Sequence, residues 1–479
     1  MVKVPRLRMV IPAVFWLCVL TAMASPAQSF RTLVNFDGTH GANPYASLVQ
    51  GLDGNFYGTT EFGGPTSAGT VFKVTPSGTL TTLYTFPSFS DGCNPVGGLV
   101  LGSDGNFYGS TSTCGATSNL CVFGCGTVFK ITPAGVLTTV HTFAATDGYQ
   151  PEAAMIQGVN GNFYGTTELG GTLGYGTVFE MTPSGKIKVL HSFAGYPSEG
   201  AYPLAAVFQT ANGTLYGTTE RGGSSTNCQT FGGIFGCGTV FKLSPSGTLT
   251  TLHSFDTSDG ALPDGGVVQA GSSLYGTTSD VATSTFGTVF KITPAGTLTT
   301  VYNFCSQASC ADGSYPGSGL IKATDGNLYG TTEEAGTGSA GTVFEITTAG
   351  TLTTLHSFDR ADGEAPFAGL LQATNGSLYG STSVGGTNEA DGTIFNVSVG
   401  LPHFVQTVPS SGSVGTSVMI LGNALTGATA VTFNGTAATF TVVSATEITA
   451  TVPSGATTGV VQATTPKGTL TSNAAFQVR

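Results

Sequence analysis

The stretch that decides the fold is Asn162-Phe163-Tyr164-Gly165-Thr166-Thr167, which is followed by Gly176-Thr177-Val178-Phe179. Both strings recur seven times, in the same order and at a period of roughly 50 residues, which is typical of a repeat architecture. The string Tyr-Gly-Thr/Ser-Thr begins at Tyr57, Tyr108, Tyr164, Tyr216, Tyr275, Tyr329 and Tyr379. The string Gly-Thr-Val/Ile-Phe begins at Gly69, Gly126, Gly176, Gly238, Gly287, Gly341 and Gly392.

Each repeat divides into four short strands rich in Val, Phe, Tyr and Thr. The repeat around Tyr164 gives predicted strands at residues 153–158, 162–167, 176–182 and 186–193. The first two strands of a repeat meet at tight turns such as Asp53-Gly54, and the last two meet at Thr-Pro-Ser/Ala-Gly. Both are hairpin signals, because Gly adopts positive φ without strain and Pro presets φ for the turn.

Seven four-stranded meanders predict an all-β protein with a seven-bladed β-propeller at residues 30–400. A β-solenoid is the competing architecture, but its coils are shorter and both of its ends need caps. The seventh repeat ends at Phe395-Asn396-Val397-Ser398 without a fourth strand, and the missing pattern stands before the first repeat as Leu33-Val34-Asn35-Phe36. This N-terminal strand is therefore expected to complete the last blade and to leave no sheet edge exposed.

Residues 1–24 have the pattern of a signal peptide, with Lys3, Arg6 and Arg8, a short apolar run and then Ala22-Met23-Ala24. The apolar run is short for a membrane anchor, and no second span follows. Removal of residues 1–24 leaves 12 basic and 26 acidic residues, a net charge of −14. This negative charge disfavours nucleic acid and anionic lipid as partners. We therefore expect a secreted or cell-surface protein without an integral membrane span; its oligomeric state stays open.

Cysteine usage also predicts export, because eight cysteines, an even number, remain outside the signal peptide. Spacing favours the local disulfides Cys228–Cys237 and Cys305–Cys310. The pairing among the other four is open; Cys114–Cys125 is favoured because it copies the first local pair, which leaves Cys93–Cys121. Zinc at the C-x3-C spacing of Cys121 and Cys125 is the weaker interpretation, since no His lies nearby.

The two faces of the predicted propeller differ. Connections between the first and second and between the third and fourth strands are tight turns, whereas the other connections vary in length and carry every cysteine of the mature chain. Loops on a rigid scaffold usually carry function, so the face with the variable loops is the candidate binding surface.

An acidic position recurs in the loop before the first strand of each repeat. The set reads His40, Asp91, Asp147, Glu199, Asp259, Asp312 and Asp362. These side chains could ring the mouth of the central channel and hold Ca²⁺ or act as acid–base pairs. The favoured alternative is that each one caps its own turn, because a catalytic site normally breaks the symmetry of its scaffold and this set does not.

Other polar positions give weaker signals. His141, His191, His253 and His356 share one repeat position on the outer strand, where packing rather than metal binding is expected. The residues after the Tyr-Gly-Thr-Thr string could add polar contacts on the variable face: Glu61, Glu168, Glu220 and Glu333. The sequence contains no G-x-S-x-G, H-E-x-x-H, P-loop or EF-hand motif, so no catalytic residue, metal ligand or cofactor is assigned.

Residues 401–479 lack the repeat and read as a small β-sandwich, with short alternating strands such as Ile448-Thr449-Ala450-Thr451-Val452. This segment resembles the IPT/TIG family of immunoglobulin-like domains, which implies a spacer or interaction unit. The strings Gly-Asn-Phe-Tyr-Gly-Thr-Thr and Gly-Thr-Val-Phe-Lys-Ile/Val-Thr-Pro resemble the tandem GloVer repeats of Gloeobacter and Verrucomicrobia-type genomes. That resemblance spans roughly residues 30–400 and implies no established activity.

The first functional hypothesis is a secreted or surface protein that binds a glycan or a protein through its loop-bearing face, without catalysis. The alternative is an extracellular propeller enzyme, a polysaccharide lyase or glycoside hydrolase, that uses carboxylates at the channel mouth. A purely structural role in the envelope is a third interpretation. The ligand itself is not encoded in any recognisable motif.

Overall fold

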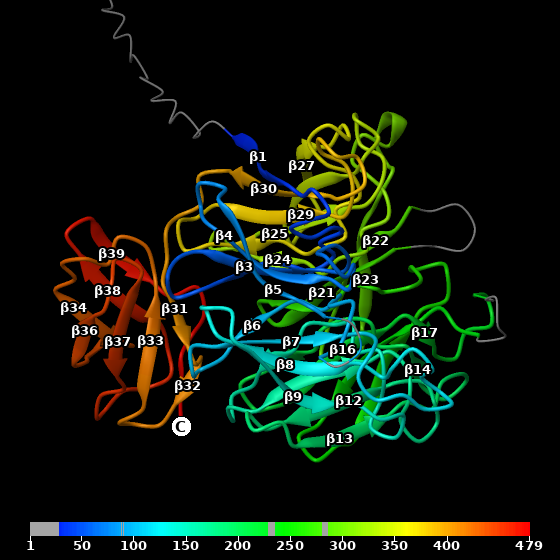
Figure 1. Cartoon of the computed structure of the whole chain (residues 1–479), viewed down its shortest axis with the longest axis horizontal. Helices are drawn as coiled ribbons and strands as arrows, with labels where there is room; N and C mark the ends of the chain where they lie inside the picture. The colour runs from blue at the N-terminus through cyan, green and yellow to red at the C-terminus, as the bar shows by residue number, and fades with distance from the viewer. Residues whose placement is uncertain (1–27, 88, 90, 229–234, 280–285) are drawn as a thin grey trace, which may run out of the picture.

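The computed structural model describes residues 28–479 apart from 88, 90, 229–234 and 280–285. The predicted signal peptide, residues 1–24, lies outside the described residues. The described chain is almost entirely β-structure, and its one helical element is the short 3₁₀ turn η1 (Ala308–Cys310) (Figure 1).

The seven repeats form seven four-stranded antiparallel sheets in the described part of the chain, numbered sheets 1 to 7 in repeat order. Their strands are β2 (Val49–Gln50), β3 (Phe56–Thr60), β4 (Thr70–Val74) and β5 (Leu80–Thr85) in sheet 1; β6 (Val100–Leu101), β7 (Phe107–Thr111), β8 (Thr127–Ile131) and β9 (Leu137–Thr142) in sheet 2; β10 (Ile156–Gln157), β11 (Phe163–Thr167), β12 (Thr177–Met181) and β13 (Ile187–Ser192) in sheet 3. They continue as β15 (Phe208–Gln209), β16 (Leu215–Thr219), β18 (Thr239–Leu243) and β19 (Leu249–Ser254) in sheet 4; β20 (Val268–Ala270), β21 (Ser273–Thr278), β22 (Thr288–Ile292) and β23 (Leu298–Asn303) in sheet 5; β24 (Ile321–Lys322), β25 (Leu328–Thr332), β26 (Thr342–Ile346) and β27 (Leu352–Ser357) in sheet 6; and β28 (Leu371–Gln372), β29 (Leu378–Thr382), β30 (Thr393–Ser398) and β1 (Ser29–Asn35) in sheet 7.

The two recurring sequence strings are the two halves of one packing unit. Gly58 in β3 pairs across the sheet with Phe72 in β4, and a Cβ on Gly58 would lie only 2.6 Å from the Phe72 ring. The same Gly–Phe pairing recurs in every sheet, for example between Gly330 and Phe344. A missing side chain on one strand thus makes room for a buried aromatic ring on the next, which explains why the strings always occur together.

Hydrogen bonds link each sheet to the next one around a closed cycle. A Thr or Ser in the second strand of each sheet donates to a carbonyl in the segment that enters the next sheet. The seven donor–acceptor pairs are Thr59–Gly97, Ser110–Pro151, Thr166–Ala205, Thr218–Gly265, Thr277–Ser318, Thr331–Ala368 and Ser381–Pro44, at 2.8 to 3.2 Å. The last bond returns from sheet 7 to the entry of sheet 1, so the described sheets form a ring.

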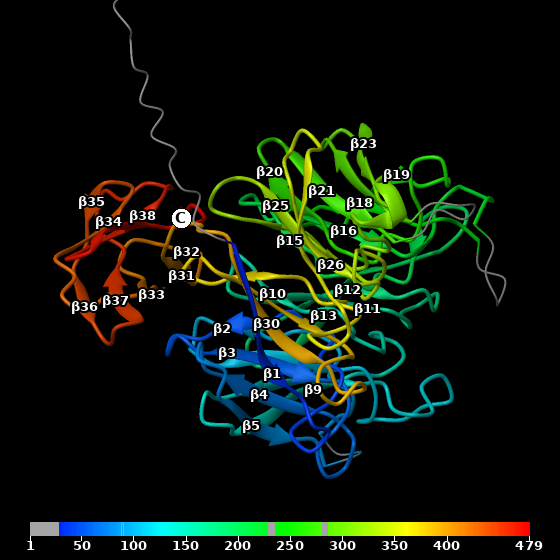
Figure 2. The same cartoon turned by 90° about the horizontal axis from the view of Figure 1, so that it is seen from above.

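The N-terminal strand belongs to the last sheet, as the sequence predicted. β1 pairs antiparallel with β30 from Ser29 opposite Ser398 to Asn35 opposite Thr393 (Figure 2). Phe36 is fully buried, and its backbone N–H donates to the carbonyl of Gly392 at 3.0 Å. The first and last segments of the repeat region are therefore joined in one sheet.

The C-terminal segment forms two further four-stranded sheets and a two-stranded parallel pair. One sheet contains β31 (Gln406–Val408), β33 (Ser417–Leu421), β36 (Phe440–Val442) and β37 (Glu447–Thr451); the other contains β34 (Ala430–Phe433), β35 (Thr436–Ala437), β38 (Val461–Thr465) and β39 (Gly468–Thr471); the parallel pair is β32 (Ser411–Gly412) with β40 (Gln477–Val478). Fully buried Ile420, Leu425 and Ile448 belong to their shared apolar core.

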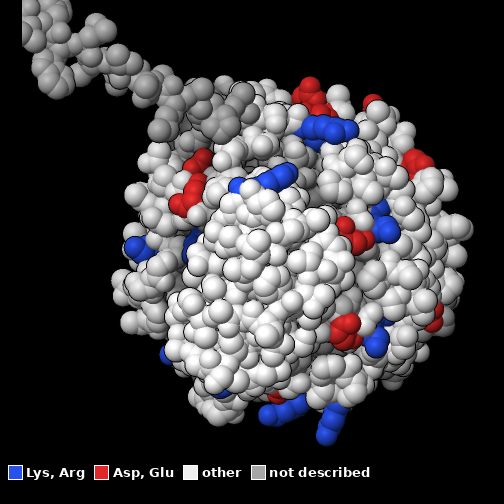
Figure 3. Space-filling view, turned by 90° about the vertical axis from the view of Figure 1, so that its left-hand side faces the viewer, with Lys and Arg blue, Asp and Glu red and all other residues white. Residues whose placement is uncertain are grey.

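The C-terminal segment packs against the turns between the first and second strands, which define the plain face of the ring. Thr446 Oγ1 donates to the carbonyl of Leu52 at 2.7 Å, and Ser411 Oγ donates to the carbonyl of Val159 at 2.7 Å. Val408, which is 5% exposed, packs into the apolar cluster that contains Tyr57 and Phe107. In Figure 3, which views this side, the surface is mostly uncharged, and acidic and basic side chains lie mainly around its rim.

Candidate functional site

The opposite side of the ring is the loop-bearing face, formed by the connections between second and third strands and by those that lead from one sheet to the next. One further strand pair, β14 (Gly200–Ala201) with β17 (Arg221–Gly222), lies within these connections. All four disulfides of the described chain lie on this face. The predicted pairs Cys228–Cys237 and Cys305–Cys310 are confirmed.

The pairing favoured for the other four cysteines was wrong. The structure joins Cys93 to Cys114 and Cys121 to Cys125. The reason is a β-bridge between Cys93 and Thr113, which lays the loop entering sheet 2 beside the start of the long loop within it. That bridge brings the Cα atoms of Cys93 and Cys114 to 5.3 Å, a normal disulfide separation. Linear spacing could not reveal a bridge between two separate loops.

The recurring acidic positions do not meet at the channel. Each of the six acidic side chains bonds to a His or Tyr on the outer strand of the preceding sheet. The pairs are Tyr84–Asp91, His141–Asp147, His191–Glu199, His253–Asp259, Tyr302–Asp312 and His356–Asp362. None of these residues, nor His40, lines the central cavity described below. The structure therefore places the predicted ring in seven separate turns.

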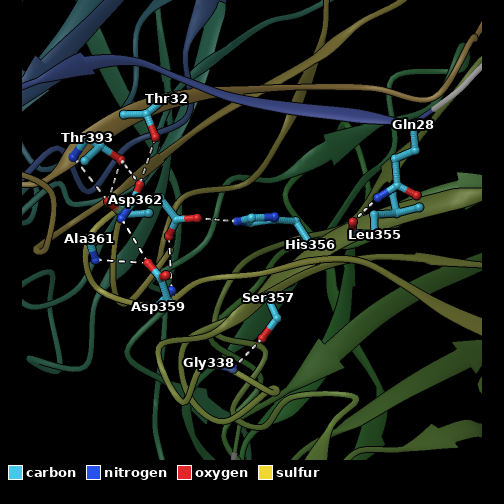
Figure 4. Close-up of polar contacts among 11 residues, drawn as sticks. Gln28, Thr32, Gly338, Leu355, His356, Ser357, Asp359, Ala361, Asp362 and Thr393 are labelled. Atoms are coloured by element: carbon cyan, nitrogen blue, oxygen red, sulfur yellow. Dashed lines mark hydrogen bonds and ion pairs between the residues drawn. The ribbon is translucent and has the colours of Figure 1, made fainter.

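Each of the six acidic side chains holds the loop that enters one sheet against the outer strand of the preceding sheet, as Figure 4 shows for Asp362. The Asp362 carboxylate lies 2.8 Å from Nε2 of His356 in sheet 6, and it also accepts the backbone N–H of Asp359 at 3.1 Å. The Asp362 carbonyl accepts a hydrogen bond from Thr393 Oγ1 in sheet 7 at 3.2 Å. Burial alone would raise the pKa of Asp362, but the bonds from His356 and Asp359 outweigh it and hold this pKa below its usual value.

His40 is the one residue of the predicted set that is not acidic, and the structure explains why. The outer strand of sheet 7 carries Val34 where other sheets carry His or Tyr, so an acidic residue in the following loop would have no partner. That loop has His40 instead, which bonds to Asp37 at 2.8 Å on the surface. The acidic residue is thus present only where a partner is present, which indicates a structural clasp.

A different set of residues surrounds the axis of the ring. A cavity of about 460 Å³ opens among the segments that enter the first strands. Its wall consists largely of small residues, among them Ser47, Gly98, Ala154, Gly266 and Gly319. Small side chains allow these segments to approach the axis closely and still leave an open centre.

The cavity lining differs from repeat to repeat at one position, the residue after the Pro of the entering loop or its equivalent. This position carries Tyr45, Val96, Glu152, Leu204, Asp264, Gly317 and Phe367. Tyr45 and Phe367 make a ring contact with centroids 5.4 Å apart. Ser279 Oγ donates to the Asp264 carboxylate at 2.6 Å. The site therefore breaks the symmetry of the repeats, which the clasp residues do not.

Burial raises the pKa of several carboxyl groups at or near the cavity toward neutrality. Burial raises the pKa of Glu152 to about 7, and repulsion from Glu61 and Glu220 adds to the shift. Burial likewise raises the pKa of Glu168 to about 8, with further repulsion from Glu152 and Glu220. On the other side, burial and repulsion from Asp264 and Glu334 raise the pKa of Glu333 to about 8.

Sequence reasoning found part of this set. Glu61, Glu168, Glu220 and Glu333 were identified by their place after the Tyr-Gly-Thr-Thr string, whereas Glu152 and Asp264 were missed. The available signal was variation: the residue after Pro changes chemistry in almost every repeat, while the two residues that follow it are always Gly, Ala or Ser. Within the described residues, no three His, Cys, Asp or Glu side chains are grouped to hold a metal ion. No described helix is long and apolar enough to cross a membrane.

Comparisons with known proteins give a family match. A family model described as the Gloeobacter/Verrucomicrobia repeat matches residues 19–231 and 227–441. No protein with a curated description matches the chain.

Solved structures give weaker likenesses. Virginiamycin B lyase from Staphylococcus aureus aligns with a TM-score of 0.47 and 15% identity, over 78% of this chain and 99% of that one. A putative 6-phosphogluconolactonase from Bacteroides uniformis aligns with a TM-score of 0.42 and 15% identity, over 66% of this chain and 84% of that one. A putative oxidoreductase (glucose dehydrogenase) from Thermus thermophilus gives 0.40 and 14%, over 78% of this chain and 100% of that one. At these scores the likenesses say nothing about the activity of this chain.

Proposed function

This chain belongs to the Gloeobacter/Verrucomicrobia repeat family, and we propose that it is an exported binding protein that holds a protein or glycan ligand on its loop-bearing face. The central cavity is the deepest part of that binding surface. In this proposal the chain has no catalytic role, and neither a metal nor a cofactor is required.

The proposal includes a finer account of the architecture. The seven sheets are the blades of one seven-bladed propeller over residues 30–400, closed by β1, and residues 401–479 are an immunoglobulin-like module of the IPT/TIG type. The cycle of hydrogen bonds from Thr59–Gly97 to Ser381–Pro44 supports the first part. The two stacked C-terminal sheets with a common core support the second.

Export rests on two observations. Residues 1–24 have the signal-peptide pattern, and the remaining cysteines form four disulfides in the described chain. Disulfides are rare in the reducing cytosol and persist in extracellular compartments. We therefore propose a secreted or cell-surface location.

The observation that carries the binding function is the asymmetric lining of the cavity. A purely structural ring would repeat the same residue at the position after Pro, but this chain places aromatic, aliphatic, acidic and small residues there, including Tyr45, Glu152 and Phe367. Pockets that combine apolar walls with a few polar groups are the usual form of a binding site. The C-terminal module packs on the plain face, so the loop-bearing face is the side that remains for a ligand.

The experiment fills the cavity without altering the backbone. Because Phe367 occupies the same repeat position as Val96 and Leu204, the double variant Val96→Phe/Leu204→Phe should fold and narrow the cavity. The full mature chain and this variant are screened on glycan and peptide arrays, with and without EDTA. Binding that is lost in this variant and retained in Val136→Phe, a change at an exposed third-to-fourth-strand turn on the other side, supports the proposal. Binding that is equal in all three proteins, or no binding at all, overturns it.

One observation keeps an enzymatic function as the second candidate. Glu152 and Glu168 interact with each other and have pKa values of about 7 and 8, which is where general acids and bases operate. A polysaccharide lyase or glycoside hydrolase would release new ends from a bound glycan. If such products form and Glu152→Gln abolishes them, the non-catalytic proposal is wrong.

A further inference from the structure

The loop-bearing face is strongly acidic. Its described connections contain nineteen acidic residues: Asp37, Glu61, Asp91, Asp147, Glu152, Glu168, Glu199, Glu220, Asp256, Asp259, Asp264, Asp312, Glu333, Glu334, Asp359, Asp362, Glu364, Glu389 and Asp391. The same connections contain only two basic residues, Arg221 and Arg360. Both arginines are already paired on the face itself, with Glu220 at 2.9 Å and with Glu364 at 3.1 Å.

The rest of the ring has the opposite balance. In the strands and tight turns of sheets 1 to 7 there are eight basic residues against five acidic ones. The basic residues are Arg31, Lys73, Lys130, Lys186, Lys188, Lys242, Lys291 and Lys322, and the acidic ones are Asp53, Asp104, Glu180, Asp325 and Glu345. The excess negative charge is thus confined to one face, where it creates a local potential that attracts cations.

The acidic face also exposes large apolar side chains. Of the fourteen large hydrophobic residues exposed in the described chain, ten lie in its connections: Phe62, Phe89, Leu120, Val122, Phe123, Leu173, Tyr196, Phe235, Phe286 and Phe367. Soluble proteins rarely gather so many on one side unless that side meets a partner.

Two disulfides and backbone hydrogen bonds constrain the loops that carry the most exposed of these residues. Phe123 and Phe89 are 80% and 76% exposed, and their two loops are joined by the Cys93–Cys114 disulfide. Backbone bonds from Cys114 to the Phe123 carbonyl at 2.8 Å and from Gly115 to the Phe89 carbonyl at 3.1 Å fix the loops further. The second disulfide, Cys121–Cys125, encloses Val122 and Phe123. A preorganised apolar tip binds without a large loss of conformational entropy.

We propose that the ligand of the loop-bearing face is a basic polypeptide segment that also carries apolar side chains. This inference rests on the proposed binding function. Charge complementarity argues for this partner, because nineteen acidic residues on one face repel anionic glycans and anionic lipid headgroups and gain nothing from neutral sugars. The exposed aromatic residues supply contacts that a purely polar ligand would leave unused.

The central cavity receives one cationic side chain of this segment. Tyr45 and Phe367 offer aromatic ring faces for a Lys or Arg side chain, and Glu152 and Glu333 lie around the same opening. The carboxyl groups around the cavity repel one another, and a bound cation relieves that repulsion.

The test uses the full mature chain and synthetic twelve-residue peptides that combine Lys or Arg with Leu and Phe. Matched peptides carry acetyl-lysine or Glu in place of the basic residue, or Ser in place of the apolar one. Fluorescence polarisation gives the Kd of each peptide at low and high salt. The expected Kd rises roughly tenfold or more from 50 to 500 mM salt and on loss of either residue class.

Two variants and two controls test the face itself. Glu152→Gln/Glu333→Gln removes two carboxyl groups that a bound cation would hold in the charged form, and Val122→Ser/Phe123→Ser removes the apolar tip; each should raise Kd about tenfold. Glu345→Gln removes one carboxyl group on the other side, and Val136→Ser alters a Val that is 65% exposed, like Val122. Both controls should leave Kd unchanged, and circular dichroism melting checks that all four proteins are folded.

The outcomes separate this inference from the binding function on which it rests. Glycan binding that depends on the cavity, without peptide binding, overturns the basic partner and leaves the binding function standing. No ligand in either array overturns both. Peptide binding that the control variants weaken as much as the face variants shows unspecific attraction and also overturns the inference.

Discussion

Nε2 of His356 lies 2.8 Å from Oδ2 of Asp362, and this contact joins the outer strand of sheet 6 to the loop that enters sheet 7. The Phe30 ring stacks on the same imidazole with centroids 3.5 Å apart, so the N-terminal strand is held at this point as well. The replacement His356→Phe keeps the ring stacking and removes the hydrogen bond. We expect the free energy of unfolding to fall by about 1–3 kcal/mol, because a largely buried carboxylate loses its partner.

Urea denaturation measures this change, and His40→Ala is the matched control. His40 pairs with Asp37 on the surface, where an ion pair contributes little, so we expect a change below about 0.5 kcal/mol. Equal losses in the two variants would show that the clasp has no special role.

The clasp also predicts an acid-side dependence of stability. The pKa of Asp362 is lowered in the folded state, so its contribution is fully present above about pH 4, where unfolded Asp is ionised. That contribution is lost as the pH falls through the lower folded value. Asp362→Asn should therefore flatten the melting temperature between about pH 4 and pH 2 relative to the parent protein. Parallel curves for the two proteins would contradict the lowered pKa.

The buried carboxyl group of Glu168, which is repelled by Glu152, predicts the opposite dependence of stability on pH near neutrality. The pKa of Glu168 is about 8 in the folded state, whereas the pKa of Glu in the unfolded chain is about 4.3. Between these values the folded state holds a proton that the unfolded state has released, so stability falls as the pH rises. Glu168→Gln should remove part of this decline and be the more stable protein at pH 9. Melting temperatures from pH 5 to 9 test it, with Glu180→Gln, on the other side of sheet 3, as the control.

The contact between the C-terminal segment and the plain face predicts a difference between two valines. Val408 is 5% exposed at this contact, whereas Val414 is 52% exposed in the same segment. Val408→Asp should cost about 3 kcal/mol, because it buries an unpaired charge, and Val414→Asp should change stability by less than about 0.5 kcal/mol. Guanidinium denaturation of both variants measures the two changes in the free energy of unfolding. A loss below about 1 kcal/mol for Val408→Asp would mean that the C-terminal segment does not pack tightly on the plain face in solution.

The disulfide pairing predicts a specific thiol pattern. Cys93→Ser should free Cys114 and leave Cys121–Cys125 intact, since these are separate bonds. Peptide mapping under non-reducing conditions, with an alkylating label on free thiols, reads out the pattern. A label on Cys121 instead of Cys114 would restore the pairing that spacing alone favoured.

Much of the fold could be predicted because the same strand and turn signals occur in all seven repeats. Hairpin turns, strand periods and the N-terminal strand that carries Leu33 are local signals, and the last three strands of the repeat around Tyr164 lie within one residue of their predicted bounds. Its first strand is only β10 (Ile156–Gln157) instead of the predicted residues 153–158, because the small residues before it line the cavity. The cysteine pairing could not be predicted, because the bridge between Cys93 and Thr113 depends on where two loops meet in space. Glu152 and Asp264 line the cavity at a position whose residue type changes from repeat to repeat, so no recurring motif marks them. At this site the informative residue is the one that varies.

The pairing of β1 with β30 also sets the order of events in time. Ser29 in β1 pairs with Ser398 in β30, so β1 cannot reach its partner until the whole repeat region between them has been synthesised. Until then, two strand edges stay open to other chains, and contacts of such long range form slowly. A nascent chain stalled before β30 has no means of completing the ring, and we expect it to depend on chaperones or to be degraded.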